Sequence, residues 1–183
     1  KFRCVLKTLN IMRLHLEIFD ENGWNIFNHI HDRKGIKEMD IIFYSAGKGI
    51  STVKQVLMNL KPLEKLRFGI NASNIVDDDV FIHLINICPK IHIFGSFPTS
   101  FTAAGLAKAF ETISSFQDAR EVQFRVDAAE MFSFQLDPSR FELVSGSFLR
   151  TRRIKLRDSG STMEHFEYAD QALVYMSNTE KNS

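Results

Sequence analysis

Several residues in this sequence have side chains with catalytic or ion-binding chemistry, but their spacing does not match a known site. Ala46–Thr52 contains the glycines and lysine of a phosphate-binding loop, yet no Ser or Thr directly follows Lys48, as that motif requires. Asp77–Asp79 could ligate a hard cation, but no second set of carboxylates follows at calcium-loop spacing. We therefore interpret the first stretch as a strand-to-helix turn and the second as a helix start, where acidic groups meet the helix dipole favourably.

The histidines and cysteines also lack the sequence spacing of a known metal or catalytic site. Neither an HExxH motif nor a Cys/His pair at zinc spacing occurs among the 6 histidines and 2 cysteines. No GxSxG-type nucleophile turn is present. Cys4 and Cys88 are predicted to be two buried thiols in a reducing compartment. We accordingly predict no catalytic, cofactor or metal site, and a protein that is not an enzyme.

Composition places the chain among globular proteins without selecting a partner. Of its 183 residues, 44% are hydrophobic and 25% charged, and 23 basic side chains nearly balance 22 acidic ones. Neither a stretch of about 20 apolar residues, as a membrane span needs, nor a secretory leader is seen, so an intracellular location, cytoplasmic or nuclear, is expected. A single domain over residues 1–183 is predicted. Its first residue is Lys1 and its pattern starts mid-repeat, as expected for part of a longer protein.

The elements that would position any functional side chain are six short segments with two apolar residues two positions apart. Such alternation is the pattern of a half-buried strand. The segments are Met12–Ile18, Glu38–Tyr44, Leu63–Ile70, Lys90–Phe94, Arg120–Val126 and Arg152–Arg157. Their first apolar positions (14, 41, 66, 91, 122 and 154) are separated by 27, 25, 25, 31 and 32 residues.

Helical spacing is found between these strands. Ile50–Leu60 is apolar at helical intervals behind a Ser51 or Thr52 cap, and a second helix follows Asp77–Asp79 and ends at Pro89. A third helix is capped by Thr102. His165–Met176 is predicted to be the last helix, and residues 131–143 are helical or irregular.

Strands that alternate with helices are expected to be parallel. A repeat of about 27 residues is shorter than the roughly 30 or more of a doubly wound unit, which is the main alternative and favours continuous apolar strands. We predict an α/β fold, a leucine-rich-repeat-like solenoid of about five to six repeats. Parallel strands would line its concave face, with helices outside and residues 127–183 as divergent C-terminal repeats or a cap.

Two motifs carry a family resemblance. Leu63-x-x-Leu66-x-Phe68 resembles the strand signature of leucine-rich repeats, and Ile87-Cys88-Pro89-Lys90-Ile91-x-Ile93 resembles the junction of the cysteine-containing repeats of F-box proteins. Over residues 33–126 the chain is similar to the divergent repeats of nematode F-box proteins. This resemblance implies the substrate-recognition region of a cullin-type ubiquitin ligase receptor. No F-box is recognisable here, so the ligase adaptor would bind a region outside this chain.

If the apolar pairs face the core, the residues between them must face the concave side. That outward set contains eight Lys or Arg residues and three acidic ones, with aromatic residues interspersed. It predicts a protein or acidic peptide as partner, attracted by the basic positions. The predicted partner-binding residues are Arg13, His15, Tyr44, Lys65, Arg67, His92, Phe94, Arg125, Arg153, Lys155 and Arg157.

Other readings of these residues stay open. Exposed strand positions tolerate charge without any function, and the cluster at 150–157 could protect an edge strand. Nucleic acid is disfavoured because the chain has no overall basic excess. At the level of function, a repeat scaffold or adaptor without a ubiquitin role and a small α/β enzyme are the alternatives.

Overall fold

One mixed, open β-sheet organises the chain. The computed structural model describes residues 12–19, 27, 35–44, 50–70, 76–95, 100–127, 141–145, 151–156, 161–168 and 171–178. The strands are β1 (Arg13–Ile18), β2 (Glu38–Phe43), β3 (Lys65–Ile70), β4 (Lys90–Gly95), β5 (Glu121–Asp127), β6 (Phe141–Ser145), β7 (Thr151–Leu156), β8 (Thr162–Tyr168) and β9 (Gln171–Ser177). They form a 9-stranded sheet in the order β1-β2-β3-β4-β5-β9-β8-β7-β6.

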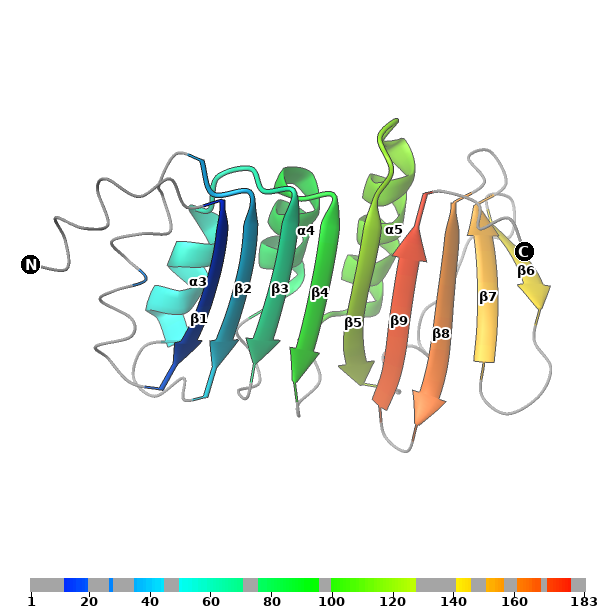
Figure 1. Ribbon diagram of the computed structural model, residues 1–183. Coiled ribbons are helices and arrows are strands. Elements are labelled where there is room, and N and C mark those ends of the chain that lie inside the picture. Colours follow the sequence, from blue (N-terminus) through cyan, green and yellow to red (C-terminus); the bar gives the residue numbers. More distant parts are fainter. Residues whose placement is uncertain are drawn as a thin grey trace, which may run out of the picture.

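The first five strands are parallel neighbours in sequence order, as predicted. Helices α3 (Ile50–Met58), α4 (Asp78–Ile87) and α5 (Ala103–Ser115) connect β2 to β3, β3 to β4 and β4 to β5. All three lie on the same face of the sheet (Figure 1). A doubly wound sheet would reverse its strand order and carry helices on both faces, and neither feature is found in the described residues. The α/β class is therefore confirmed.

Strand pairing differs from the predicted repeat alignment by two residues at β2. Leu14 pairs with Met39, and Met39 pairs with Leu66, whereas the spacing of apolar residues had matched Leu14 with Ile41. Met39, Ile41 and Phe43 are all buried, so three consecutive inward positions offered two alignments. Because the shift is two residues, every side chain keeps its predicted face. Neighbours across the strands, however, change.

Phenylalanine fills the layer between the sheet and the helices. Seven phenylalanines are buried among the described residues: Phe27, Phe43, Phe68, Phe81, Phe101, Phe110 and Phe124. The rings of Phe81 and Phe101 are stacked with centroids 4.2 Å apart, and the Phe124 ring lies 4.8 Å from Phe81 at 67°. Large rings occupy positions that smaller aliphatic residues would leave partly empty. This packing accounts for seven of the 17 phenylalanines in the sequence.

The C-terminal half is antiparallel, which corrects two predictions. β5 pairs with β9, and β9, β8, β7 and β6 follow as an antiparallel series. The expected last helix over His165–Met176 is wrong, because residues 165–168 belong to β8 and residues 171–176 to β9. The predicted sixth strand exists as β7, but its two partners are antiparallel and it does not adjoin β5.

Most predicted helix ends are confirmed. The Asp77 carboxylate accepts a hydrogen bond from the Val80 N–H, and the Thr102 hydroxyl accepts one from Gly105 N–H, so both residues are N-caps. α4 ends at Ile87, directly before Cys88 and Pro89. The predicted Ser51 or Thr52 cap is wrong, since α3 already begins at Ile50. The predicted turn at Gly47 and Gly49 lies outside the described residues. The spacing of Trp24, Phe27 and Ile30 also predicts one short helical face after the first strand, but of these three only Phe27 is described.

Asn178, directly after β9, joins the two halves of the sheet. Its amide oxygen accepts a hydrogen bond from the Arg120 N–H at 2.7 Å. Its amide nitrogen donates to the carbonyl oxygens of Phe116 and Asp118, at 3.0 and 2.7 Å. One side chain thereby satisfies three backbone groups of the turn that leads from α5 into β5.

Replacing Asn178 by alanine is expected to lower the free energy of unfolding by about 1–3 kcal/mol, because backbone groups in the turn lose their partners. Urea denaturation of both proteins measures the difference. Asn86→Ala is the control, since the Asn86 side chain is exposed and, among the described residues, donates its hydrogen bond to Ile82 O within α4. It should change stability by no more than about 0.5 kcal/mol. Equal losses in the two variants would show that Asn178 has no joining role.

Candidate functional site

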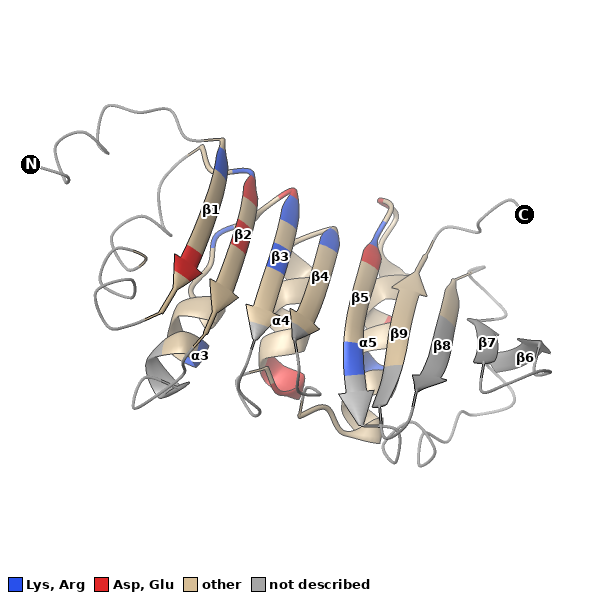
Figure 2. Ribbon diagram, turned by 60° about the horizontal axis from the view of Figure 1, so that its bottom comes forward, with Lys and Arg blue, Asp and Glu red and all other residues tan. Residues whose placement is uncertain are grey.

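The sheet face turned away from α3, α4 and α5, here called the strand face, carries most of the predicted partner-binding residues. Strand alternation and parallel pairing place its side chains in rows that run across the strands. The first row contains Arg13, Glu38, Lys65, Lys90 and Glu121; the second contains His15, Asp40, Arg67, His92 and Gln123; the third contains Glu17, Ile42, Gly69 and Phe94. Charges gather toward the beginnings of the strands (Figure 2).

Over β1 to β3, much of the positive charge is neutralised by neighbouring carboxylates. The Arg13 guanidinium lies 3.1 Å from Glu38 Oε1. Asp40 Oδ2 lies 3.2 Å from His15 Nδ1 and 3.3 Å from Arg67 Nη1. Asp40 was not among the predicted site residues, and it reaches both neighbours because of the two-residue shift of β2. This part of the strand face is therefore a network of paired charges.

Positive charge is less compensated over β3 and β4. Among the described residues, no carboxylate oxygen lies within 4.0 Å of the Lys65 or the Lys90 ammonium. Burial lowers the pKa of His92, and the positive charges of Arg67, Lys65 and Arg125 lower it further, while Asp40 acts in the opposite sense. Burial and the neighbouring cations thus both disfavour the protonated imidazole.

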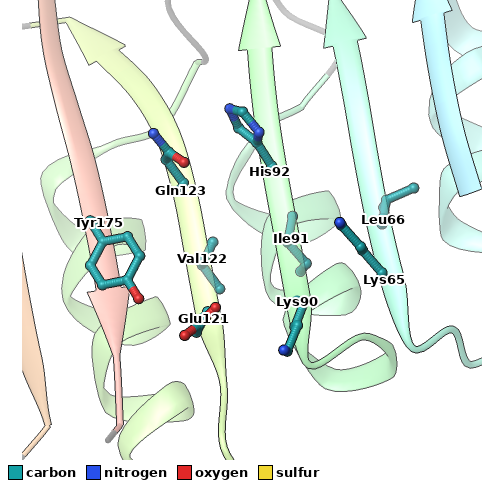
Figure 3. Close-up of a pocket in the computed structure, with 9 residues that line it drawn as sticks. All are labelled: Lys65, Leu66, Lys90, Ile91, His92, Glu121, Val122, Gln123 and Tyr175. Carbon is teal, nitrogen blue, oxygen red and sulfur yellow. The ribbon is translucent and has the colours of Figure 1, made fainter. Parts of the chain in front are cut away.

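A hollow of about 240 Å³ opens on this part of the strand face. The polar residues that line it are Lys65, Lys90, His92, Glu121, Gln123 and Tyr175. Leu66, Ile91 and Val122 also border it, but they are core residues buried against the helices. Figure 3 shows the polar side chains projecting from β3, β4, β5 and β9. A second hollow, of about 280 Å³, lies over β1 to β3 and is lined by the contacting side chains of Arg13, Glu38, His15, Asp40 and Arg67, together with Lys65.

Beside the first hollow lies an apolar platform, formed by Phe94 over Gly69. A Cβ at Gly69 would lie 2.9 Å from two Phe94 ring atoms and 3.3 Å from Ile42 Cγ2, so only glycine lets the ring lie this low. The Arg67 guanidinium lies 5.1 Å from the Phe94 ring centroid, and the His92 ring centroid lies 5.4 Å away. The platform is thus flanked by a cation and an imidazole.

A second aromatic pair stands at the ends of β1 and β2. The rings of Phe19 and Tyr44 are stacked with centroids 4.3 Å apart and planes 3° apart. They remain 60% and 42% exposed, which is unusual for large aromatic side chains. Tyr44 was a predicted site residue, and Phe19 was missed because it follows the strand instead of standing between its apolar pair.

Tyr175 was also missed, because the C-terminal segment had been predicted as a helix. Helical spacing of Phe166, Ala169 and Leu173 competes there with period-two alternation, in which Leu173, Tyr175 and Ser177 share one face. Val174 and Met176 are buried and Tyr175 is half-buried, as alternation requires. That second periodicity was the available signal.

Three predicted residues are not brought to the same place as the others. Arg153 and Lys155 lie on β7, and strands β9 and β8 stand between β7 and β5. At about 4.8 Å per strand, β7 is roughly 14 Å from β5. Arg153 and Lys155 therefore do not lie on a strand next to that of Arg125. The side chains of Arg153 and Lys155, and Arg157 as a whole, lie outside what the structure describes.

Reactive groups elsewhere are few. Burial raises the pKa of the Cys88 thiol to about 11, and its Sγ lies 3.2 Å from Lys90 O, so this cysteine is a buried thiol as predicted. Cys4 lies outside the described residues. Within the described ranges, no three His, Cys, Asp or Glu side chains are grouped to hold a metal ion. In the same part of the chain, no helix is long and apolar enough to cross a membrane.

The strand face therefore combines a partly uncompensated basic hollow with exposed and half-exposed aromatic rings. Arginine and aromatic side chains of this kind are enriched where proteins bind each other. Comparison of the chain with protein-family models, curated proteins and solved structures gave no match.

Proposed function

We propose that this chain is a non-catalytic protein-interaction module and that the strand face is its binding surface. The observation that carries the proposal is the meeting of the basic hollow at Lys65 and Lys90 with the Phe94–Gly69 platform on one exposed sheet face. Positive groups increase the rate at which an acidic partner is encountered, and aromatic anchors supply affinity. A protein or an acidic peptide is the partner class that fits both.

We further propose that β1 to β5 are units of a leucine-rich-repeat-like solenoid. The successive offsets support this architecture: Leu14 pairs with Met39, Met39 with Leu66 and Leu66 with Ile91, which are steps of 25, 27 and 25 residues. Sequential parallel strands with helices on one face are the arrangement that stacked repeats require. The step from Ile91 to Val122 is longer, and the antiparallel strands then act as a divergent C-terminal cap.

The motifs around Leu63–Phe68 and Ile87–Ile93 support a more specific role, as the substrate-recognition region of an F-box-type ubiquitin ligase receptor in the cytoplasm or nucleus. Affinity purification of the full-length protein from cells tests this role. Recovery of cullin-ligase adaptors supports it. Recovery of other partners through the strand face, without adaptors, would favour a scaffold or adaptor outside ubiquitin transfer.

Charge reversal on the strand face tests the surface itself. Arg67→Glu is expected to reduce recovery of the physiological partner by about tenfold or more, since like charge at an interface costs several kcal/mol. Lys108→Glu on exposed helix α5 reverses one charge on the opposite side and should leave recovery unchanged. Reduced recovery of the partner with Lys155→Glu would indicate that the binding surface extends to β7. Equal recovery with Arg67→Glu and wild type, with both proteins folded, would contradict the proposed surface.

A further inference from the structure

The hollow over β3, β4, β5 and β9 has a defined charge balance. Two ammonium groups, from Lys65 and Lys90, and one carboxylate, from Glu121, stand among its lining residues. Lys90 and Glu121 are paired positions of adjacent strands, but their charged atoms form no ion pair. These three groups give the lining one positive charge in excess. A single negative charge from outside would balance it.

Hydrogen-bonding groups surround the same space. The Gln123 amide, the His92 imidazole and the Tyr175 hydroxyl all border the hollow from different strands (Figure 3). The Gln123 amide and the imidazole N–H can donate hydrogen bonds to an anionic oxygen, and charge-assisted hydrogen bonds of this kind are the strong ones.

The apolar platform lies one step further along β4. Lys90, His92 and Phe94 alternate on the strand face, and two residues of a strand span about 6.6 Å. An extended peptide has the same spacing between side chains on one of its faces. A peptide that places one side chain in the hollow would therefore bring the side chain two positions away over Phe94 and Gly69.

We propose that the hollow is the anchor of the strand face, that it takes a carboxylate from an acidic peptide of a partner protein, and that Phe94 on Gly69 takes an aliphatic or aromatic side chain two positions away. This proposal rests on the proposed function and names the partner's chemistry. Glu121 sets the selectivity. It limits the excess to one positive charge, which one carboxylate neutralises, whereas a phosphate group carries close to two negative charges at neutral pH and would leave the occupied hollow negative.

Selection from a random library of extended 12-residue peptides, with the full chain as bait, tests the proposal. Enriched peptides are expected to contain Asp or Glu two positions from an aliphatic or aromatic residue. One such peptide is then made in three further forms, with Gln for Glu, with Gly for the apolar residue, and with phosphoserine for Glu. The carboxylate form should bind most tightly when dissociation constants are measured by fluorescence anisotropy.

Matched variants locate the anchor. Lys90→Glu should weaken binding of the selected peptide by about tenfold or more, because attraction is replaced by repulsion, and Lys108→Glu should not weaken it. Thermal unfolding confirms that both are folded. Tighter binding of the phosphoserine form, or enrichment without acidic residues, would overturn the proposed carboxylate. If Arg67→Glu loses peptide binding and Lys90→Glu does not, the hollow is not the anchor, but the strand face remains the binding surface. If neither variant loses peptide binding, the proposed function is overturned as well.

Discussion

Phe81→Ala is expected to lower the free energy of unfolding by about 3–5 kcal/mol, the largest effect of any substitution considered for this protein. Phe81 is fully buried, and its ring contacts Phe101 at 4.2 Å and Phe124 at 4.8 Å. The three rings come from α4, from the residue before the Thr102 cap and from β5. Alanine leaves a cavity at the centre of this cluster and removes two aromatic contacts, worth about 0.5–1.5 kcal/mol each beyond area burial.

Urea denaturation followed by circular dichroism measures this loss, provided that the slope of the transition is unchanged. Phe81→Leu is the matched control, because leucine keeps much of the buried volume. Its loss should be clearly smaller than that of alanine. A loss below about 1 kcal/mol for Phe81→Ala, typical of surface positions, would contradict the central place of the ring cluster.

Gly105→Ala is expected to destabilise the protein by about 2–4 kcal/mol, although alanine in a helix normally stabilises by about 1 kcal/mol relative to glycine. A Cβ at Gly105 would lie 1.9 Å from Asp78 Oδ1, so the carboxylate must move. That carboxylate accepts hydrogen bonds from the Thr102 N–H at 2.9 Å and the Thr102 hydroxyl at 2.6 Å. Hydrogen bonds to charged groups contribute about 1.5–3 kcal/mol each, which outweighs the gain in helix propensity.

A double-mutant cycle separates this contact from other effects of the new methyl group. In an Asp78→Ala background the obstructing carboxylate is absent, so Gly105→Ala should be neutral or stabilise by up to about 1 kcal/mol. Chemical denaturation of the four proteins gives the coupling energy. If Gly105→Ala were equally destabilising in both backgrounds, close approach of α4 and α5 at this point would not explain the glycine.

The strands of the parallel half were predictable because their side chains alternate between two different environments. In β2, Met39, Ile41 and Phe43 face the helices while Asp40 and Ile42 face the other way, and that contrast is visible in sequence order alone. Thr102 and Asp77 were predictable as caps because a cap bonds to residues three positions ahead. Both signals are local.

The candidate site was predictable only in part. The strand face carries Lys65, Arg67, His92 and Phe94 as expected, because residues two positions apart in a strand point to the same side of the sheet. The pairing of Asp40 with both His15 and Arg67 was not predictable, because it depends on which of three inward apolar residues of β2 lies beside Leu14. Tyr175 joins the hollow only because β9 returns antiparallel to β5.

The sequence alone determined that the residues with reactive side chains are not spaced as in a known catalytic or metal site. It also determined the two faces of each parallel strand and the α/β class. Periodicity and motif spacing are read between near neighbours in the chain, and these features depend on nothing else. Tertiary structure alone decided the register of β2, the antiparallel half and the separation of β7 from β5. It also decided which basic residues are paired with acids. Each of these depends on contacts between residues far apart in sequence, where two local patterns are equally satisfied and only packing of the whole sheet selects one.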